Sequence, residues 1–225
     1  MRWMVLGLGL GLPAVAAADP LTFGPDRPGV GDSTTTPGRG HAIVEGGIAA
    51  AVGAGDVAVG TSSVTGRLGV DEGVELRLRL PDVTFADGWS AGTLGLGAKV
   101  GGELGERWSS SVVAEASIDP SGGPVGGSLG GNVAVALGDV GLWGHASAAG
   151  AAGPVAVLAG GGASVGFGPH GVFVNGGSVV GAGPFAGVGA WITPGDAVQV
   201  DVGCDVFWVG GAATATPAVG LAVGL

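Results

Sequence analysis

Two stretches of the chain decide its fold. They are Val74-Glu75-Leu76-Arg77-Leu78-Arg79-Leu80 and Val198-Gln199-Val200-Asp201-Val202-Gly203-Cys204-Asp205-Val206. In both stretches the apolar residues alternate with the others, and every charged residue falls between apolar ones. Because successive side chains of a β-strand point to opposite faces, this period of two predicts strands with one apolar and one polar face.

The composition of the whole chain favours strands over helices. Of 225 residues, 52 are Gly and 13 are Pro, and both disfavour the interior of a helix. Charged residues make up 12% and the mean hydropathy is +0.56, which excludes an intrinsically disordered chain. Glycine has no period of three, which excludes a collagen helix. One all-β domain is therefore expected.

Weaker alternation continues along the rest of the chain. The stretches 94–100, 112–118 and 219–225 alternate apolar with small or polar residues, and the first contains Lys99, the only lysine. From Val140 to Gly195 no residue is Asp, Glu, Lys or Arg, but prolines interrupt this run four times. The pieces are too short and too rich in Gly and Ala for spanning helices of about 20 residues, so strands are predicted here too.

Alternation alone fits either a soluble β-sandwich or an outer-membrane β-barrel. Charge is scarce even for the exposed half of a soluble sheet, whose edges are usually protected by lysines. The candidate strands, at about 9 to 13 residues, are long for a globular sheet and suited to crossing a bilayer at a tilt. We therefore predict a single closed antiparallel transmembrane β-barrel, with the apolar face toward lipid and the polar face toward the lumen.

Turn-forming residues divide the barrel into about twelve predicted strands. These are 41–53, 57–70, 74–80, 92–102, 108–118, 127–137, 140–149, 155–167, 172–180, 185–192, 197–207 and 217–225. Every second connection is short, at 71–73, 102–107, 138–139, 168–171 and 193–196, as expected of periplasmic turns. The predicted outer loops are 81–91, 119–126, 150–154 and 208–216.

The first forty residues differ from the barrel region 41–225. Residues 1–18 have an early Arg2, an apolar stretch and Ala16-Ala17-Ala18, which together predict a signal peptide for export. Residues 19–40, called the lead-in below, are rich in Pro, Gly, Ser and Thr, and we expect an extended segment on the periplasmic side. The expected location is the bacterial outer membrane, with its lipid and the barrel-assembly machinery as partners.

Charge and cysteine content exclude several classes of ligand. The net charge is −10, so a nucleic-acid partner is not expected. Cys204 is the only cysteine, and His41, His145 and His170 are scattered, so we expect neither a disulfide nor a metal or cofactor. We also expect no enzyme: a catalytic serine elbow is not expected, and Gly160-Gly161-Gly162 lacks the Lys-Ser/Thr of a phosphate loop.

The alternation also predicts which polar side chains face the lumen. The candidates are Glu45, Glu75, Arg77, Arg79, Lys99, Glu115, Asn132, Asn175, Gln199, Asp201 and Asp205. They form either a paired network that fills the interior or a charged lining that selects solutes. His145 is expected in the lumen rather than as a general base. Most tryptophans lie near predicted strand ends, where anchoring at the membrane interface is expected.

Several short motifs carry a resemblance to a known family. They are Asp26-Arg27-Pro28, Asp32-Ser33, Pro37-Gly38-Arg39-Gly40-His41, Glu45-Gly46-Gly47, 68–77 and 96–99. Together they resemble a bacterial family of small outer-membrane β-barrels called transporters, which is named for the meta-cleavage pathway of phenol degradation. The resemblance covers roughly residues 26–100 and implies a passive channel or uptake protein for small, including aromatic, compounds.

Independently of that resemblance, Asp26 and Arg27 beside Pro28 are suited to fixing the lead-in to the barrel mouth by ion pairs. The predicted function is passive passage of small solutes across the outer membrane. Two alternatives stay open at this point. One is a non-conducting barrel with a structural or surface-interaction role. The other is a secreted, soluble, Gly-rich β-sandwich or adhesin module.

Overall fold

A computed structural model describes residues 21–26, 31–53, 55–123, 125–151 and 153–225, so the predicted signal peptide lies outside the described residues. The described part contains fourteen β-strands. They are β1 (Ala42–Gly53), β2 (Asp56–Asp71), β3 (Val74–Arg79), β4 (Val83–Phe85), β5 (Trp89–Ala91), β6 (Leu94–Glu103), β7 (Trp108–Ile118), β8 (Gly126–Leu137), β9 (Val140–Gly150), β10 (Ala156–Phe167), β11 (His170–Val179), β12 (Gly183–Ile192), β13 (Val198–Val209) and β14 (Ala212–Gly224).

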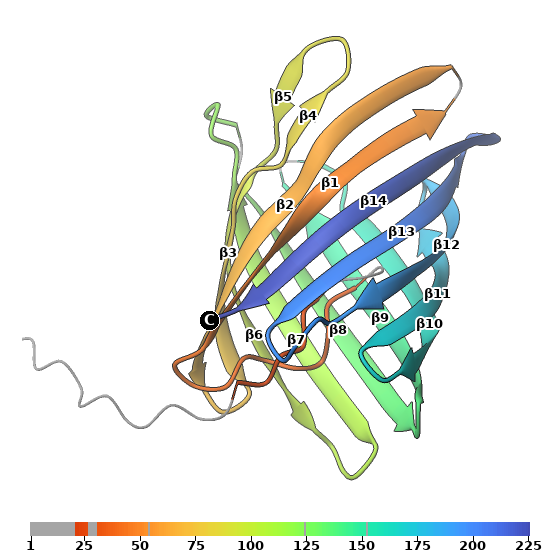
Figure 1. Cartoon of the computed structure of the whole chain (residues 1–225). Helices are drawn as coiled ribbons and strands as arrows, with labels where there is room; N and C mark the ends of the chain where they lie inside the picture. The colour runs from red at the N-terminus through yellow and green to blue at the C-terminus, as the bar shows by residue number, and fades with distance from the viewer. Residues whose placement is uncertain (1–20, 27–30, 54, 124, 152) are drawn as a thin grey trace, which may run out of the picture.

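Twelve of these strands close into one antiparallel barrel (Figure 1). Each barrel strand pairs with its neighbours in sequence, and β14 pairs with β1 along nine residue pairs, which closes the cylinder. The predicted twelve-stranded closed barrel is confirmed. The alternative of a β-sandwich is wrong, because the strands form one continuous closed sheet rather than two packed sheets. Across the described ranges, no helix is long and apolar enough to cross a bilayer.

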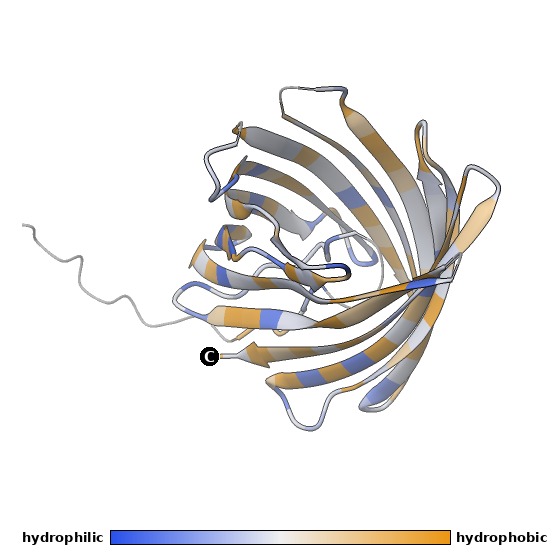
Figure 2. Cartoon of the chain, turned by 90° about the horizontal axis from the view of Figure 1, so that it is seen from above, coloured by the Kyte–Doolittle hydropathy of each residue, from blue (hydrophilic) through white to orange (hydrophobic). Residues whose placement is uncertain are grey.

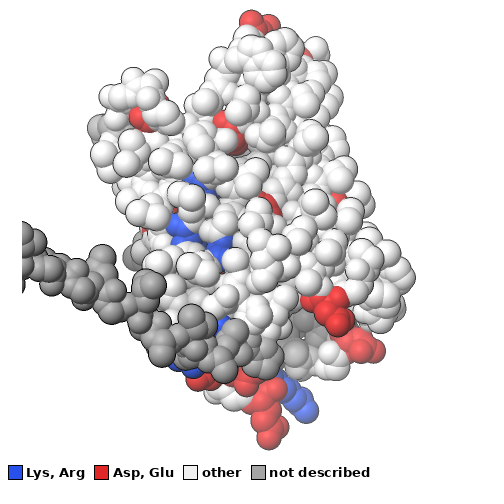
Figure 3. All heavy atoms as spheres, turned by 60° about the vertical axis from the view of Figure 1, so that its left-hand side comes forward, with Lys and Arg blue, Asp and Glu red and all other residues white. Residues whose placement is uncertain are grey.

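The apolar side chains of the barrel point outward. Leu76 is 49% exposed while its neighbour Glu75 is fully buried, and Leu221 is 48% exposed beside the fully buried Ala222. Between the ends of the described barrel strands, no charged residue occupies an outward position. Figure 2 shows the resulting stripes of apolar residues along the strands, and Figure 3 shows a barrel face with few charged side chains above an acidic lower end. A water-soluble protein buries such side chains, so this surface is inverted.

The connections predicted to be short lie at the lower end of the barrel in Figure 1, together with the lead-in. Two of them are two-residue turns that begin at Gly138 and Gly168, whose φ angles are +66° and +62°. The predicted outer loop 208–216 is wrong: β13 runs to Val209, and β14 begins at Ala212 after a Gly210-Gly211 turn. The alternation of Ala and Thr over 212–216 has too little contrast in hydropathy to mark a strand.

The predicted outer loop 81–91 contains the hairpin β4–β5, which stands above the barrel rim (Figure 1). It pairs with β2 through only two residue pairs, Val59 with Phe85 and Gly60 with Thr84. The Phe85 and Trp89 rings contact each other at a centroid distance of 5.1 Å, and Trp89 is 78% exposed. This hairpin extends the barrel wall without contributing to its closure.

Candidate lumen site

The described part of the lead-in enters the barrel and contacts the inner wall. The Thr34 hydroxyl lies 2.6 Å from the Ser109 hydroxyl of β7, and the Asp26 amide donates to Glu45 Oε2 of β1 at 2.9 Å. At its far end, the Gly40 amide donates to the Gly69 carbonyl of β2. The lead-in therefore crosses the lower part of the lumen rather than staying outside the barrel.

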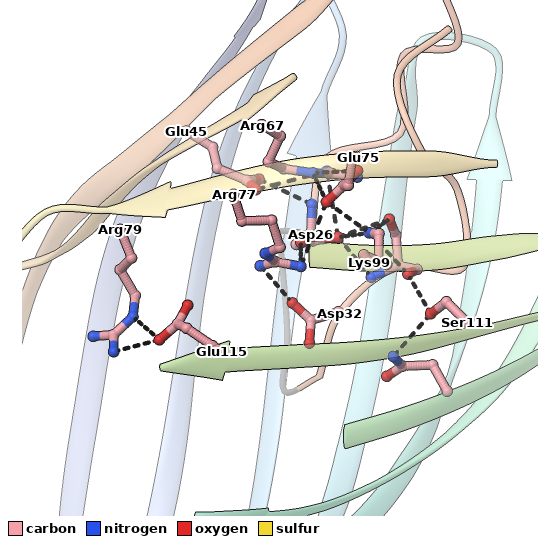
Figure 4. Close-up of polar contacts among 12 residues, drawn as sticks. Asp26, Asp32, Glu45, Arg67, Glu75, Arg77, Arg79, Lys99, Ser111 and Glu115 are labelled. Carbon is pink, nitrogen blue, oxygen red and sulfur yellow. Dashed lines mark hydrogen bonds and ion pairs between the residues drawn. The ribbon is translucent and has the colours of Figure 1, made fainter. Parts of the chain in front are cut away.

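Seven charged residues meet where the lead-in crosses, and we call them the lumen cluster (Figure 4). They are Asp26 and Asp32 of the lead-in, Glu45 of β1, Arg67 of β2, Glu75 and Arg77 of β3, and Lys99 of β6. The strand register brings the wall residues together, because Arg67 is opposite Arg77 and Glu75 is opposite Lys99. Side chains on neighbouring strands at one level of the sheet lie close enough to pair.

Arg67 and Glu75 form the buried centre of the cluster. Arg67 Nε donates to Glu75 Oε1 at 3.0 Å, and Arg67 Nη2 donates to Glu75 Oε2 at 2.9 Å. Neither side chain is exposed to solvent. Arg67 also donates to the lead-in carbonyls of Gly24 and Thr35, at 2.8 Å each. This two-pronged pair is the strong geometry for an arginine and a carboxylate, and it also holds the lead-in backbone.

The Asp26 carboxylate lies among three cations of the wall. Its Oδ1 is 2.8 Å from Lys99 Nζ and 3.3 Å from Arg67 Nη1, and its Oδ2 is 2.9 Å from Arg77 Nη1. Ser33 also donates to Oδ1 through its amide and its hydroxyl. Burial acts to raise the pKa of Asp26, but Arg67, Lys99 and Arg77 together lower it well below its ordinary value. Asp26 is therefore a carboxylate held in its charged form.

A second lead-in carboxylate, Asp32, accepts from Arg77 Nη2 at 2.8 Å. Burial, followed by the negative charge of Asp26, raises the pKa of Asp32. Apart from the cluster, Arg79 Nε donates to Glu115 Oε1 at 2.8 Å, and this pair is partly exposed to the lumen. The lead-in thus supplies two acidic groups to a wall that presents three cations and two carboxylates within the cluster.

A chain of hydrogen bonds runs from the lead-in along β7, β8 and β9, which follow β6 in the wall. The Ser111 hydroxyl donates to the Ser33 carbonyl, and Asn132 Nδ2 donates to the Ser111 hydroxyl. His145 Nδ1 lies 2.6 Å from Asn132 Oδ1, and His145 Nε2 lies 3.1 Å from the Ser147 hydroxyl. The chain places His145 in the lumen and joins β7, β8 and β9 to the lead-in.

The letters G-x-S-x-G do occur twice, over 126–130 and 162–166, although no catalytic serine elbow was expected. Ser128 and Ser164 lie within β8 and β10, on straight strands whose neighbours are also strands. A nucleophile elbow needs a sharp turn from a strand into a helix. The two spacings are therefore by-products of the glycine-rich strands.

All eleven predicted lumen residues lie on the inner face of the barrel. Glu45, Glu75, Arg77 and Lys99 belong to the lumen cluster, Arg79 pairs with Glu115, and Asn132 belongs to the hydrogen-bond chain. The other four come from β11 and β13: Asn175, Gln199, Asp201 and Asp205.

Sequence reasoning missed Arg67, a fully buried cation of the cluster. The signal was present, since Leu68 and Val70 follow it in alternation and both are exposed on the outside. Asp26 lies in the cluster, whereas Arg27 and Pro28 of the same motif lie outside the described residues. Among the described residues, no group of three or more His, Cys, Asp or Glu is arranged to hold a metal ion.

The anchoring role expected of the tryptophans is wrong for Trp143 and Trp191. Both point into the lumen, where their rings lie against Gly162 and Gly171 of the neighbouring strands. A Cβ atom at either glycine would collide with the ring, so the missing side chain makes room for it. Trp143, Trp191 and Phe173 of the wall line one side of a cavity of about 440 Å³, and the lead-in, including Phe23, lines the other.

Two further cavities occupy the lumen around the cluster. One of about 420 Å³ is lined by Asp26, Glu45, Arg77 and His145, among others. The other, of about 560 Å³, is lined by Arg77, Arg79 and Glu115 and lies beside the β7 and β8 ends near the upper rim. Arg77 and Asp32 line both of these cavities, so open space reaches the cluster along the lumen.

Comparison with known proteins shows the type of fold. No protein-family model matches the chain, and no curated protein sequence matches it. The NanC porin structure in a rhombohedral crystal form matches with a TM-score of 0.57 and 9% identity, covering 81% of this chain and 98% of that one. At this identity, the likeness shows a porin-like barrel fold and nothing finer.

Two further solved structures are less similar to this chain, with TM-scores below 0.5. The CymD monoaromatic hydrocarbon channel gives a TM-score of 0.49 at 7% identity, covering 83% of this chain and 88% of that one. The translocator domain of the autotransporter NalP from Neisseria meningitidis gives 0.46 at 14% identity, covering 81% and 87%.

Proposed function

We propose that this protein is an outer-membrane channel for the passive passage of small solutes. The observation that carries the proposal is the inverted barrel, which is apolar outside and polar inside, with cavities of about 420 and 560 Å³ along its lumen. Lipid contacts the outer face in this account, and water and solute occupy the inner one. Export through a signal peptide and insertion by the barrel-assembly machinery belong to the same proposal.

Selection of solutes in this account comes from the size and charge of the lumen. Glu45, Arg77, Arg79 and Glu115 line the two cavities of this path, and the lead-in narrows its lower part through Asp26 and Asp32. Passage therefore requires either a route beside the lead-in or its movement. A charged constriction of this kind selects by hydration and electrostatics rather than by chemistry.

Conductance across a planar lipid bilayer tests the channel. Folded protein is expected to give discrete current steps, and a variant lacking residues 19–40 is expected to give larger ones. Migration that changes on heating confirms that both proteins are folded barrels. Folded protein without any current step, in the full chain and in the shortened variant alike, would favour the alternative of a non-conducting structural barrel.

We further propose that small aromatic compounds are among the solutes. The support is the cavity of about 440 Å³ lined by Phe23, Trp143, Phe173 and Trp191, since aromatic rings pack favourably against one another. Benzyl alcohol, an uncharged probe, should quench the tryptophan fluorescence of the wild type saturably. Trp143→Leu should weaken this binding, whereas Trp89→Leu on the exposed hairpin should leave the binding constant unchanged. Equal binding by both variants would exclude this cavity.

A further inference from the structure

The group formed by Arg67, Arg77 and Lys99, called the cationic cradle here, resembles a ligand site that is already filled. A single carboxylate, that of Asp26, contacts all three cations, at 3.3, 2.9 and 2.8 Å. None of the three side chains is more than 8% exposed, so they are held out of bulk water. Each arginine reaches the Asp26 carboxylate through one nitrogen and Lys99 through its ammonium group, and several cations converging on one carboxylate are an arrangement by which proteins recognise carboxylate ligands.

The occupant of the cradle belongs to a segment without regular structure. The described lead-in residues 21–26 and 31–40 contain no strand, and polar groups rather than a β-ladder hold Asp26 in place. The cavity of about 420 Å³ is lined by Asp26 and Arg77, so a solute in the lumen reaches the cradle. Without Asp26 and Asp32, the cradle has three cations against the two carboxylates of Glu45 and Glu75, which favours one entering anion.

We propose that the cationic cradle is a binding site for small carboxylate solutes, for which Asp26 is a tethered stand-in. A carboxylate arriving through the lumen takes the place of the Asp26 side chain, and the lead-in leaves the wall. The proposal rests on the proposed channel function, because the solute reaches the cradle through the lumen. For that channel, the proposal specifies the class of solute, small carboxylates, and the group that the solute displaces, the Asp26 side chain.

The surroundings of Asp26 also indicate which carboxylates bind best. The Asp26 amide donates to Glu45 Oε2 at 2.9 Å, so the cradle pairs a carboxylate site with an acceptor for a nearby donor. In 3-hydroxypropanoate, the hydroxyl is separated from the carboxylate by the same number of atoms as the amide in aspartate. Propanoate has the same carbon chain and no donor. The hydroxyl compound is expected to bind about tenfold more tightly, because only it can donate a hydrogen bond to the Glu45 carboxyl group.

Electron paramagnetic resonance distances measure the position of the lead-in directly. Nitroxides on Thr22→Cys of the lead-in and Asp139→Cys of the lower turn, in a Cys204→Ala background, should give a narrow distance distribution in the full-length barrel. Both labelled positions are exposed, so the labels do not disturb packing. Added 3-hydroxypropanoate should broaden the distribution saturably, with propanoate needing about tenfold more. Sodium chloride at equal ionic strength should leave it narrow.

Three variants separate the cradle from its surroundings. Asp26→Asn should give the broad distribution without added solute, because the stand-in has lost its charge. Arg77→Gln should abolish the difference between carboxylate and chloride. Arg79→Gln removes a lumen cation outside the cradle and should respond as the wild type does. Heat-modifiable migration checks that each variant forms a barrel.

Two results would overturn the carboxylate site. One is a distribution that stays narrow at saturating carboxylate in the folded wild type. The other is equal broadening by chloride at the same ionic strength, which would indicate simple screening. Conductance distinguishes this failure from that of the channel itself. Current steps that carboxylates do not alter, with an unchanged distance distribution, would support the channel and contradict the carboxylate site. Broadening of the distance distribution without any current would support the carboxylate site and contradict the channel.

Discussion

At the scale of single residues, Arg67 and Glu75 form an ion pair that is buried on the lumen side of the barrel wall. Both side chains are fully buried, and their two-pronged contact has nitrogen to oxygen distances of 3.0 and 2.9 Å. Such a pair contributes little net stability compared with an apolar pair of similar size, but breaking it is costly because one buried charge loses its partner. The pair therefore specifies the register of β2 against β3.

Glu75→Gln should lower the free energy of unfolding by about 3 kcal/mol, since Arg67 would stay buried with its best partner gone. Arg79→Gln breaks a pair whose arginine is 26% exposed, and should cost about 1 kcal/mol or less. Urea titration of the folded barrel in detergent micelles measures both. If the free energy of unfolding falls no more in Glu75→Gln than in Arg79→Gln, then leaving Arg67 buried without its partner is not costly, and the prediction is contradicted.

The alternation of residues predicted which face of the barrel a side chain points to, but it did not predict which residue that side chain pairs with. Glu75, Arg77 and Lys99 are recognised from the apolar residues on either side, because lipid on one face demands a strict period of two. Arg67 is flanked by Leu68 in the same way, but Gly66 and Gly69 weaken the contrast around it. The contacts of Asp26 could not be predicted, because the lead-in has no alternation that would show which wall residues lie beside it.

At the scale of elements, short turns join neighbouring strands at both ends of the barrel. The turn between β13 and β14 consists of Gly210 and Gly211, with φ angles of +60° and +86°. Both angles lie in the left-handed region that residues with a Cβ atom avoid. The sequence shows the two glycines but not this turn, because the weakly alternating residues after them resemble a loop.

Replacing Gly210 and Gly211 together by Ala should destabilise the barrel by about 2 to 4 kcal/mol, from about 1 to 2 kcal/mol of strain per residue. Gly102→Ala is the matched control, because a Cβ at Gly102 meets nothing within 4 Å and its backbone is not left-handed. It should change stability by about 0.5 kcal/mol or less. Equal effects of the two changes in urea titrations would mean that the turn is not strained.

The position of the lead-in is expected to depend on pH, because two of its carboxyl groups belong to the lumen cluster. The pKa of Asp26 is lowered, so its contribution to docking is complete above its ordinary value of 3.8 and is lost as the pH falls below that value. The pKa of Asp32 is raised, so its proton uptake acts in the opposite direction and begins at higher pH. The charged groups facing them are Arg67, Arg77, Lys99, Glu45 and Glu75.

The distance distribution between labels on Thr22→Cys and Asp139→Cys should therefore stay narrow from neutral pH to 3.8, and broaden only at lower pH. Asp32→Asn should keep this behaviour, because Asp32 does not supply the acid-sensitive contact. A distribution that broadens between pH 6 and 5 in the wild type would contradict the assignment of Asp26 as the lead-in group held by the cradle.

At the scale of the whole molecule, the barrel has apolar side chains on its outer face and polar side chains inside, the reverse of a water-soluble protein. Outward Val and Leu side chains are exposed by half or more in many strands, and charged groups meet inside. Alternation alone could not decide between this arrangement and a sandwich, since both present one apolar face. The closure of β14 on β1 removes the second possibility, and hydrocarbon is then the environment that stabilises the outer face.

Quenching of a fluorophore at two adjacent positions of β8 tests this arrangement most directly. Leu129 is 59% exposed on the outer face, while Ser128 lines the lumen cavities. In vesicles, and in a Cys204→Ala background, a bimane on Leu129→Cys should be quenched by brominated lipid and protected from aqueous iodide. The same label on Ser128→Cys should be quenched by iodide and not by the lipid. Quenching of both positions by iodide alone would contradict a membrane-spanning barrel.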